Sequence, residues 1–482
     1  MKKVLLLVAA LLVGAGLVFS STIPAVQSFS LSIGRVPSAN QISVKSRDLN
    51  LVCPGALQVS GGRSGAKLGA FSPLNTALVS TYANTATGAK FAASELGKSG
   101  AGAIPERVTA PISITAKDES GTADQGSKLL EANQIQLASE SNIAGLAGTQ
   151  CQKPSHDLWL IGGNTTVGRE ALLVLANPSA VDALLDIEIF NEAGKAEATG
   201  LNGFAVAANK TALLQLASVV PKSKSFVVHV SSRGGAVAAW VQQKVVRGLS
   251  ATGVDYLSPD SGFATSQYLP GLLIRGTKSA AKLAKQNEDY ADLVPSLRVF
   301  VPGSKLATVT AQILGSNAKS FGTVIQQTVG GRKLVDIPIT GLADGDYVAV
   351  LNSTEPIAAS ISFSRTDAAK NPVSDFGLLV DAQAATDLRA IRVPSSGISK
   401  LSVVNGSKQT ATVTLVNGSK RVSFKLNDAA SKVVELTPGA LVTVSSDQPV
   451  AASMVVDLNG AVTALPITDY KNAKGRVAVS VR

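Results

Sequence analysis

The two histidines are the first residues to consider for chemistry, because imidazole exchanges protons near neutral pH and binds metals. His156 lies in Ser155-His156-Asp157, which has the residue types of a hydrolytic triad. A triad is defined by geometry and not by adjacency in sequence, so we interpret His156 as a solvated turn residue. His229 alternates with valines, and we expect it on an exposed or edge-facing side of a strand. Two distant histidines predict no metal site.

Two short motifs resemble nucleotide or acyl-transfer sites without their structural context. The run from Ala92 to Ser99 fits a permissive phosphate-loop pattern, but Gly100-Ala101-Gly102-Ala103-Ile104-Pro105 follows where a helix must begin. Ser64-Gly65-Ala66-Lys67 fits the first element of penicillin-binding enzymes, whereas their Lys-Thr-Gly element is absent from the sequence. Neither motif predicts catalysis.

Acidic residues likewise form no recognisable site. A glycosidase needs two carboxylates that face each other across a cleft, and the acids of this chain are scattered singly. The segment from Asp255 to Asp260 has oxygen ligands, but its spacing matches no known calcium loop. We therefore predict a protein that is not an enzyme and has no catalytic, cofactor-binding or metal-binding residues.

Cys53 and Cys151 are the only cysteines of the chain. An even, minimal set in an exported protein is most simply one disulfide. A bond between Cys53 and Cys151 would close a loop of about 100 residues. Closing such a loop removes roughly 4 to 5 kcal/mol of unfolded-chain entropy. A redox-active or metal-binding pair is the alternative, but there is no Cys-x-x-Cys motif and no cluster of ligands beside either cysteine.

A threefold repeat organises the rest of the chain. A strand-like run, a polar turn and a second strand recur at residues 226–241, 347–362 and 441–455. We interpret each copy as a hairpin. Its marker residues are Ala236 and Trp240 in the first copy, Ile357 and Ser360 in the second, and Val450 and Ser453 in the third.

Short β-branched strands with Gly, Asn and Pro turns favour an all-β fold of tandem immunoglobulin-like β-sandwich domains, placed after an N-terminal transmembrane or signal helix. Only 4% of the 482 residues are aromatic, which suits closely packed sheets. The predicted segments are a signal anchor or signal peptide at 1–21, a linker at 22–38, an N-terminal β/loop region at 39–154 tied by the disulfide to the first repeat, β-sandwich repeats at 155–262, 263–370 and 371–470, and a tail at 471–482.

The second repeat contains a segment of different composition. Residues 278–293 are helix formers, basic first and acidic later, which opposes the helix dipole. We interpret the segment as a helical insertion at the edge of the repeat. It is either a surface embellishment or a partner-binding loop.

The N-terminus predicts export. Lys2 and Lys3 precede the apolar run from Val4 to Phe19, so the chain after it is translocated. The run is long for a signal peptide and short for a membrane span, and both an uncleaved anchor and a cleaved signal remain open. We expect an extracytoplasmic protein that is anchored by this helix or secreted.

Several motifs resemble those of a known family. The segments Trp159-Leu160-Ile161-Gly162-Gly163, Leu172 to Pro178, Gly235 to Val241 and Gly253-Val254-Asp255-Tyr256 are similar to an uncharacterised family of actinobacterial envelope proteins. That family carries a domain of unknown function after an N-terminal membrane segment. Cys53-Pro54 and Cys151 match its early Cys-Pro and its second cysteine. The resemblance implies an anchored or secreted β-rich protein and brings no catalytic residue.

The net charge of +11 is compatible with anionic neighbours. Nucleic acid is not predicted, because there is no Lys/Arg-rich block and few aromatics to stack on bases. Our leading hypothesis is a scaffold, spacer or accessory interaction module with protein partners in the cell envelope. The alternative is a binding module for an anionic or carbohydrate wall polymer, and a cell-wall hydrolase comes third. The sequence does not determine the oligomeric state.

Overall fold

The computed structural model describes residues 41–43, 49–60, 71–83, 90–117, 130–316, 322–366, 374–468 and 476–478. The predicted signal or anchor, the linker and most of the tail lie outside these residues. The chain divides into two compact units. In the smaller unit, β1 (Gln41–Ser43) pairs with β35 (Arg476–Ala478). The larger unit, residues 47–473, contains all the features described below.

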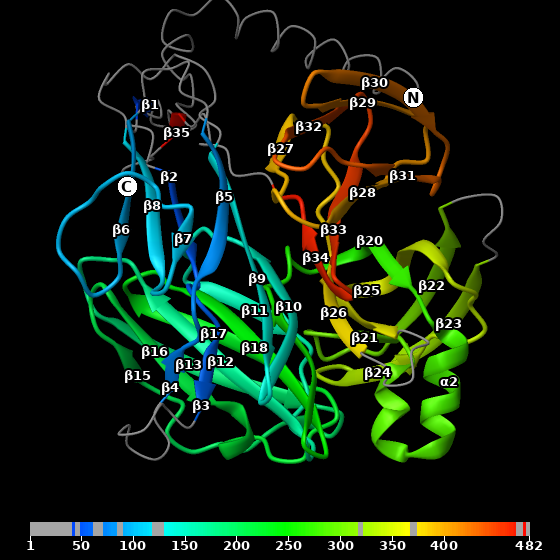
Figure 1. Ribbon diagram of the computed structural model, residues 1–482, viewed down its shortest axis with the longest axis horizontal. Helices are drawn as coiled ribbons and strands as arrows, with labels where there is room; N and C mark the ends of the chain where they lie inside the picture. The colour runs from blue at the N-terminus through cyan, green and yellow to red at the C-terminus, as the bar shows by residue number, and fades with distance from the viewer. Residues whose placement is uncertain are drawn as a thin grey trace, which may run out of the picture. The chain divides into compact units, whose positions relative to one another are not determined.

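The larger unit is built from four lobes of antiparallel sheets (Figure 1), which we call lobe A (residues 49–150), lobe B (157–257), lobe C (264–380) and lobe D (389–466). The prediction of an all-β fold is confirmed. In the part of the chain that the structure describes, no helix has the length and apolar character needed to cross a membrane.

Lobe A pairs a four-stranded sheet with a three-stranded one. Its strands are β2 (Leu49–Cys53), β3 (Gln58–Ser60), β4 (Phe71–Pro73), β5 (Ala77–Ala83), β6 (Lys90–Glu95), β7 (Arg107–Val108), β8 (Ile112–Lys117), β9 (Leu130–Glu140) and β10 (Ile143–Gln150). The sheet orders are β10-β9-β5-β7 and β2-β8-β6, and β3 pairs with β4 alone. Cys53 and Cys151 lie together in the core of this lobe.

Lobe B is the first of the predicted repeats. Its elements are β11 (Asp157–Ile161), β12 (Arg169–Asn177), β13 (Ala183–Asn191), β14 (Gly194–Lys195), β15 (Phe204–Val206), β16 (Lys210–Gln215), η2 (Leu216–Ser218), β17 (Val227–Gly234), β18 (Ala238–Arg247) and β19 (Ser250–Leu257). One sheet has the order β11-β17-β13-β14, with β15 beside β13, and the other has the order β16-β12-β18-β19. In β13, Leu185, Ile187 and Ile189 are buried, as their alternation predicts.

Lobe C contains the longest strand. Its elements are β20 (Ala264–Ile274), α2 (Thr277–Gln286), η3 (Glu288–Leu293), β21 (Ser296–Phe300), β22 (Ala307–Gly315), β23 (Thr323–Val329), β24 (Leu334–Pro338), β25 (Gly345–Thr366) and β26 (Ser374–Val380). The first half of β25 pairs with β20 and β22, and its second half pairs with β21 and β26. The insertion at 278–293 contains α2 and η3.

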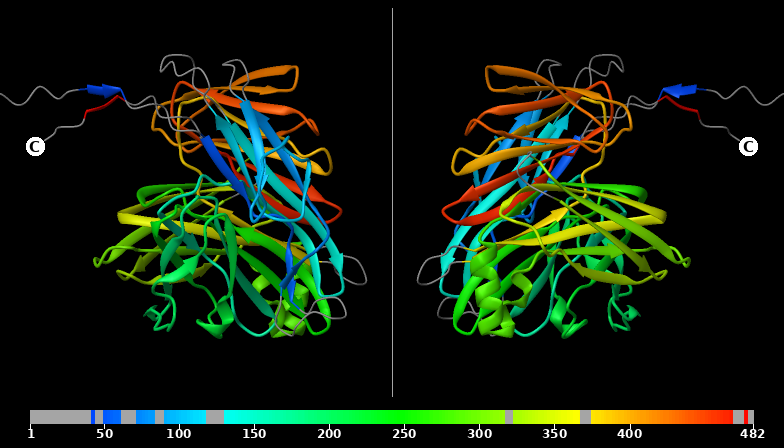
Figure 2. Two further views of the ribbon diagram at one scale, coloured as in Figure 1. Left: turned by 90° about the vertical axis from the view of Figure 1, so that its left-hand side faces the viewer. Right: turned by 90° about the vertical axis from the view of Figure 1, so that its right-hand side faces the viewer.

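Lobe D repeats the arrangement with two four-stranded sheets. Its strands are β27 (Arg389–Arg392), β28 (Ile398–Asn405), β29 (Ala411–Asn417), β30 (Lys420–Leu426), β31 (Ser431–Glu435), β32 (Leu441–Ser446), β33 (Val450–Leu458) and β34 (Ala461–Pro466). The orders are β27-β32-β29-β30 and β31-β28-β33-β34. In Figures 1 and 2, β30 and α2 lie at opposite ends of the unit.

The repeated segments that we interpreted as hairpins are corners between sheets. In lobe B, β17 pairs with β11 and β13, whereas β18 pairs with β12 and β19 in the other sheet. In lobe D, β32 and β33 also belong to different sheets, and in lobe C the single strand β25 serves both. The hairpin prediction was wrong because two adjacent strand patterns do not reveal whether the strands pair with each other.

The strand after each corner is buried on both faces, which explains its small residues. In lobe B, Ala239 and Val241 point into the lobe's own core, and Ala238 and Trp240 pack against lobe A. In lobe C, Ala358 contacts the lobe B side. In lobe D, Ala451 contacts the lobe C side. The Ala-Ala pair therefore allows close packing between neighbouring lobes.

Candidate functional site

Four edge strands, one from each lobe, meet in the interior of the larger unit. They are β10, β19, β26 and β34, and each is the last strand of its own sheet. β10 contacts β19 and β34, and β26 contacts the same two strands, so the contacts form a closed circuit. We call this meeting of strands the axial junction. Lobe A supplies one of the four strands. The disulfide was expected to tie this region to the first repeat, but Cys53 and Cys151 both lie in the core of lobe A, so the bond closes a loop within that lobe.

Asp255 of β19 is fully buried at the axial junction and binds strands from the other three lobes. Its Oδ1 accepts a hydrogen bond from the backbone N–H of Gly148 in lobe A (3.0 Å) and from the hydroxyl of Thr463 in lobe D (2.8 Å). Its Oδ2 accepts one from the N–H of Leu378 in lobe C (2.8 Å). One carboxyl group thus links four lobes.

Asp375 of β26 makes the reciprocal contacts. Its Oδ2 accepts hydrogen bonds from the N–H groups of Leu146 in lobe A (2.9 Å) and Val462 in lobe D (2.8 Å). Its Oδ1 accepts a longer one from Val254 in lobe B (3.3 Å). Edge strands normally present unpaired backbone groups. Here the two carboxyl groups satisfy several of them.

Burial dominates the ionisation of both groups. It raises the pKa of Asp255 well above its ordinary value, although the amide and hydroxyl donors oppose the shift. Burial also raises the pKa of Asp375 to about 7, again against backbone hydrogen bonds that favour the charged form. These carboxyl groups are bound to protein donors, so we interpret them as links between lobes.

Glycines permit the close approach of these strands. A Cβ atom on Gly148 would lie 2.6 Å from the side chain of Thr463, and one on Gly145 would lie 2.6 Å from the backbone nitrogen of Val254. Gly145 also has φ = 133°, which disfavours other residues. The axial junction therefore requires glycine at these positions.

Two further acidic sites lie where lobes meet. Glu131 of lobe A accepts hydrogen bonds from the N–H of Arg392 in lobe D (2.9 Å) and from the side chain of Asn133 (3.1 Å). Burial raises the pKa of Glu131 to about 8. Asp260 and Asp381 form a carboxyl pair. The N–H and hydroxyl of Ser261 both donate to Asp381, and burial raises the pKa of both carboxyl groups.

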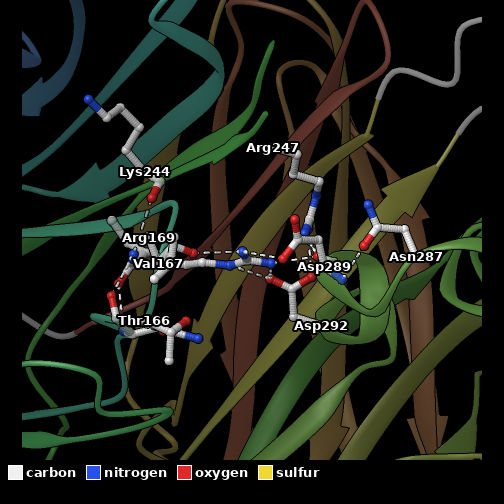
Figure 3. A network of polar contacts seen from close by, with 10 residues as sticks. Thr166, Val167, Arg169, Lys244, Arg247, Asn287, Asp289 and Asp292 are labelled. Atoms are coloured by element: carbon white, nitrogen blue, oxygen red, sulfur yellow. Dashed lines mark hydrogen bonds and ion pairs between the residues drawn. The ribbon is translucent and has the colours of Figure 1, made fainter. Parts of the chain in front are cut away.

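An arginine pair holds the helical insertion against lobe B (Figure 3). Arg169 of β12 donates two hydrogen bonds to Asp292 Oδ2, at 3.0 and 2.7 Å, and one to the carbonyl of Asp289 at 2.6 Å. Arg247 of β18 donates to Asp292 Oδ1 at 2.6 Å and also contacts the Asp289 carbonyl. Burial lowers the pKa of Arg247. The acidic end of the insertion thus neutralises two nearly buried guanidinium groups.

His229 differs from its prediction. It lies on β17, an inner strand of its sheet, and not at an edge. Its ring nitrogens contact Asp157 Oδ1 (2.6 Å) and Glu188 Oε2 (3.0 Å), and its ring stacks on Trp159 at 3.8 Å. Lys195 and His229 lower the pKa of Glu188. The alternation with valines predicts which face of the strand His229 occupies. It does not predict these partners, which lie on neighbouring strands.

Among the other candidate residues, the structure contains the predicted disulfide, with Cys53 and Cys151 buried and bonded to each other. His156 is exposed. Lys98 forms an ion pair with Glu95 in a turn, and Ser64–Lys67 lie outside the described residues. Within the described ranges, no cluster of three or more His, Cys, Asp and Glu side chains is placed to hold a metal ion.

The marker residues of the repeat are distributed along the corners. Ile357 and Val450 are fully buried, whereas Ala236 is half-buried. Trp240, Ser360 and Ser453 occupy corresponding positions and are buried too. The structure does not bring these six residues together in one site.

The motif residues behind the family resemblance support packing. Gly163 lies against the ring of Phe226, where a Cβ atom would not fit. Asn177 is buried, donates to the carbonyls of Val181 and Val206, and accepts from Ser179. Asn405 has the same role in lobe D.

Sequence reasoning missed the roles of Asp255 and Asp375. A usable signal is present in the printed sequence: an aspartate close to a glycine inside an apolar strand, as in Gly253-Val254-Asp255-Tyr256 and Asp375-Phe376-Gly377-Leu378. A buried acid needs hydrogen-bond donors, and the glycine lets another strand supply them.

The fold and the axial junction define a multi-lobed, all-β protein with a buried disulfide, a combination that indicates an extracytoplasmic protein. The model of a family of unknown function, DUF5719, matches residues 106–446, and the chain belongs to this family. The expectation of a domain of unknown function is thereby confirmed.

Other comparisons add little. No curated protein matches the chain. One solved structure, from a study of host cell surface retention of a 1.5-MDa bacterial ice-binding adhesin, aligns with 66% of this chain and 98% of its own, at 13% identity and a TM-score of 0.10. The strand pairings alone define the fold.

Proposed function

We propose that this chain is a non-catalytic protein of the cell envelope that acts as a scaffold, spacer or accessory interaction module. One observation carries the proposal: the acidic groups Asp255 and Asp375 are used to bind backbone amides of neighbouring lobes. Their contacts link the four lobes within one compact unit, which suits a protein whose role is to present a surface. An actinobacterial envelope origin, implied by the motif resemblance, is part of this proposal.

Partner capture tests the proposal. The full chain, carrying an affinity tag, would be cross-linked in cells and purified from membrane fractions. Residues 1–38 fused to an unrelated domain serve as the control, because they share the export segment and lack the lobes. Envelope proteins enriched by the full chain over this control support the proposal. Enrichment equal to the control, or hydrolysis of wall material by the purified chain, contradicts it.

Attachment to the membrane is a separate part of the proposal. The apolar run from Val4 to Phe19 either anchors the protein or is removed as a signal. Intact-mass measurement of the protein from cells distinguishes the two. A full-length mass in the alkali-resistant membrane fraction indicates an anchor, and a shortened mass in the medium indicates a cleaved signal. Recovery from the cytoplasm would contradict both.

A second candidate function is binding of an anionic wall polymer, favoured by the outer strand of lobe D. Lys420, Arg421 and Lys425 are exposed on β30, the edge strand of its sheet. Arg421 and Lys425 share a face with Thr412 and Thr414 of β29, according to the strand register. Cations beside hydroxyl groups suit a polymer that carries both phosphate and sugar. Charged side chains on an edge strand such as β30 also have a structural role, because they prevent the edge from pairing with a strand of another molecule.

Co-sedimentation with purified wall polymer tests this candidate. We expect the triple variant Lys420→Glu/Arg421→Glu/Lys425→Glu to bind at least about tenfold more weakly at low salt, since charge attraction is strongest there. The matched control reverses Lys278, Lys282 and Lys285 on α2, at the opposite end of the unit (Figure 2). Equal weakening by both triple variants would indicate non-specific attraction and contradict a site on β30.

A further inference from the structure

The helical insertion covers an apolar cavity. The cavity measures about 180 Å³. Its wall includes Ile274, Leu293, Ile339 and Leu342 from lobe C and Ala280 and Ala281 from α2. Apolar cavities of about 150 Å³ are known to hold a benzene molecule. On that scale this cavity has room for roughly six to eight carbon atoms.

The helix that roofs the cavity is not fixed by a core of its own. No residue of α2, within Thr277–Gln286, is buried. The α2 residues that line the cavity are Thr277, Ala280 and Ala281, all with short side chains, so the space below the helix is unfilled. A helix packed for stability alone would place larger residues there, because empty apolar space costs free energy.

Polar contacts at the two ends hold the insertion in place. At the start of α2, the Asp344 carboxylate accepts hydrogen bonds from the N–H of Gly276 (2.9 Å), the N–H of Thr277 (3.0 Å) and the Thr277 hydroxyl (2.7 Å). At the other end, Asp292 binds the arginine pair. Polar contacts therefore hold the insertion at both of its ends.

The charged residue that lines the cavity is Arg275, which pairs with Asp346, and the lysines of α2 lie outside the lining. α2 carries Lys278, Lys282 and Lys285, all exposed, and has no acidic residue. We propose that the cavity binds the hydrocarbon chain of an anionic amphiphile, with a fatty acyl chain of about six to eight carbons inside and its head group near the lysines of α2. The bound hydrocarbon belongs either to a free fatty acid or to the end of a lipid tail.

Calorimetric titration of the full chain with a series of fatty acids, from butanoate to dodecanoate, tests the proposal. We expect affinity to rise about fourfold per methylene up to about eight carbons and then to level off, because further methylenes find no apolar wall. We also expect a negative heat-capacity change, which marks apolar burial. Octyltrimethylammonium should bind at least tenfold more weakly than octanoate.

Two substitutions fill the cavity from its roof. Ala280→Phe and Ala281→Met should each weaken octanoate binding at least tenfold, and denaturant unfolding will show that both variants remain folded. Phosphatidylglycerol vesicles separate the two sources of the chain: vesicle binding that octanoate inhibits indicates a lipid tail, and octanoate binding alone indicates a free acid. The proposal would be overturned if millimolar octanoate failed to bind, or if it bound equally well to both filled variants. It would also be overturned if vesicle binding were unaffected by the two substitutions and by octanoate.

Discussion

At the scale of single residues, the most informative groups are the carboxyls buried between lobes. In an unfolded chain, Asp375 and Glu131 have ordinary pKa values of 3.8 and 4.5. Burial raises these to about 7 and about 8 in the folded protein. At pH values between the unfolded and the folded pKa of each group, the folded state binds more protons than the unfolded state. The free energy of unfolding therefore falls as the pH rises through this range.

We expect the stability contributed by these groups to be complete below about pH 4 and lost by about pH 8. The shift of Asp375 corresponds to a loss of about 4 kcal/mol. Denaturant unfolding at pH 5 and pH 8 measures about 3 kcal/mol of this loss, because an unfolded Asp375 is already ionised at pH 5. Asp375→Asn, which does not ionise, should reduce the difference in unfolding free energy between the two pH values by about 3 kcal/mol, whereas the exposed Asp428→Asn should leave it unchanged. An unchanged pH dependence in Asp375→Asn would show that this carboxyl is already ionised at pH 5.

Gly145 provides a second prediction at this scale. Gly145 and Gly262 have nearly the same positive φ, 133° and 130°, so Ala strains both alike. A Cβ atom on Gly262 meets nothing within 4 Å, whereas one on Gly145 collides with Asp375 and Val254. We expect Gly145→Ala to destabilise the protein by at least about 2 kcal/mol more than Gly262→Ala, because the collision displaces the buried carboxylate from its donors. Equal losses of stability in the two variants, measured by thermal unfolding, would mean that the axial junction shifts to accommodate the added methyl group.

The sequence predicts a residue's face far better than its partners. The alternation of apolar and polar residues correctly predicts that Leu185, Ile187 and Ile189 are buried, because the two-residue period of a strand is visible in neighbouring residues. The partners of His229 and Asp375 lie 41 to 229 residues away. No local pattern contains that information. Cys53 and Cys151 are the exception, since two cysteines allow a single pairing.

At the scale of elements, the disulfide connects the end of β2 to the residue after β10 across 98 positions. Loop closure of this length predicts that removing it costs roughly 4 to 5 kcal/mol. Unfolding of the double variant Cys53→Ala/Cys151→Ala measures this loss. Both cysteines are buried, so we expect the native protein to resist dithiothreitol until denaturant is added. Rapid reduction without denaturant would show that lobe A opens locally.

Elements also show where sequence reasoning stops. The sequence predicts strand positions in the repeats, but it does not distinguish a corner between sheets from a hairpin, because the choice of partner sheet depends on packing between lobes. The insertion shows a similar limit. Its charge order opposes the helix dipole, yet Asp344 supplies the missing negative group at the start of α2, and the arginine pair binds its acidic end. The compensating groups lie 45 or more positions away in the sequence.

At the scale of the whole larger unit, the four lobes depend on one another. Separate apolar clusters join A to B, B to C and C to D, and Ile135 and Leu146 of lobe A complete the core of lobe D. The axial carboxyls connect the same lobes through hydrogen bonds. Loss of one lobe would expose apolar surface and unpaired polar groups on two others. We infer that the lobes unfold together.

Both tryptophans lie in lobe B, which makes this inference testable. Tryptophan fluorescence reports lobe B, whereas far-UV circular dichroism reports all strands. Leu401→Ala removes a fully buried side chain from lobe D and should cost about 2 to 5 kcal/mol. If unfolding is concerted, both signals shift to lower denaturant by the same amount, while the exposed Val422→Ala leaves them unchanged. An unshifted fluorescence midpoint beside an earlier dichroism step would show that lobe D unfolds alone, as independent domains in a linear array do.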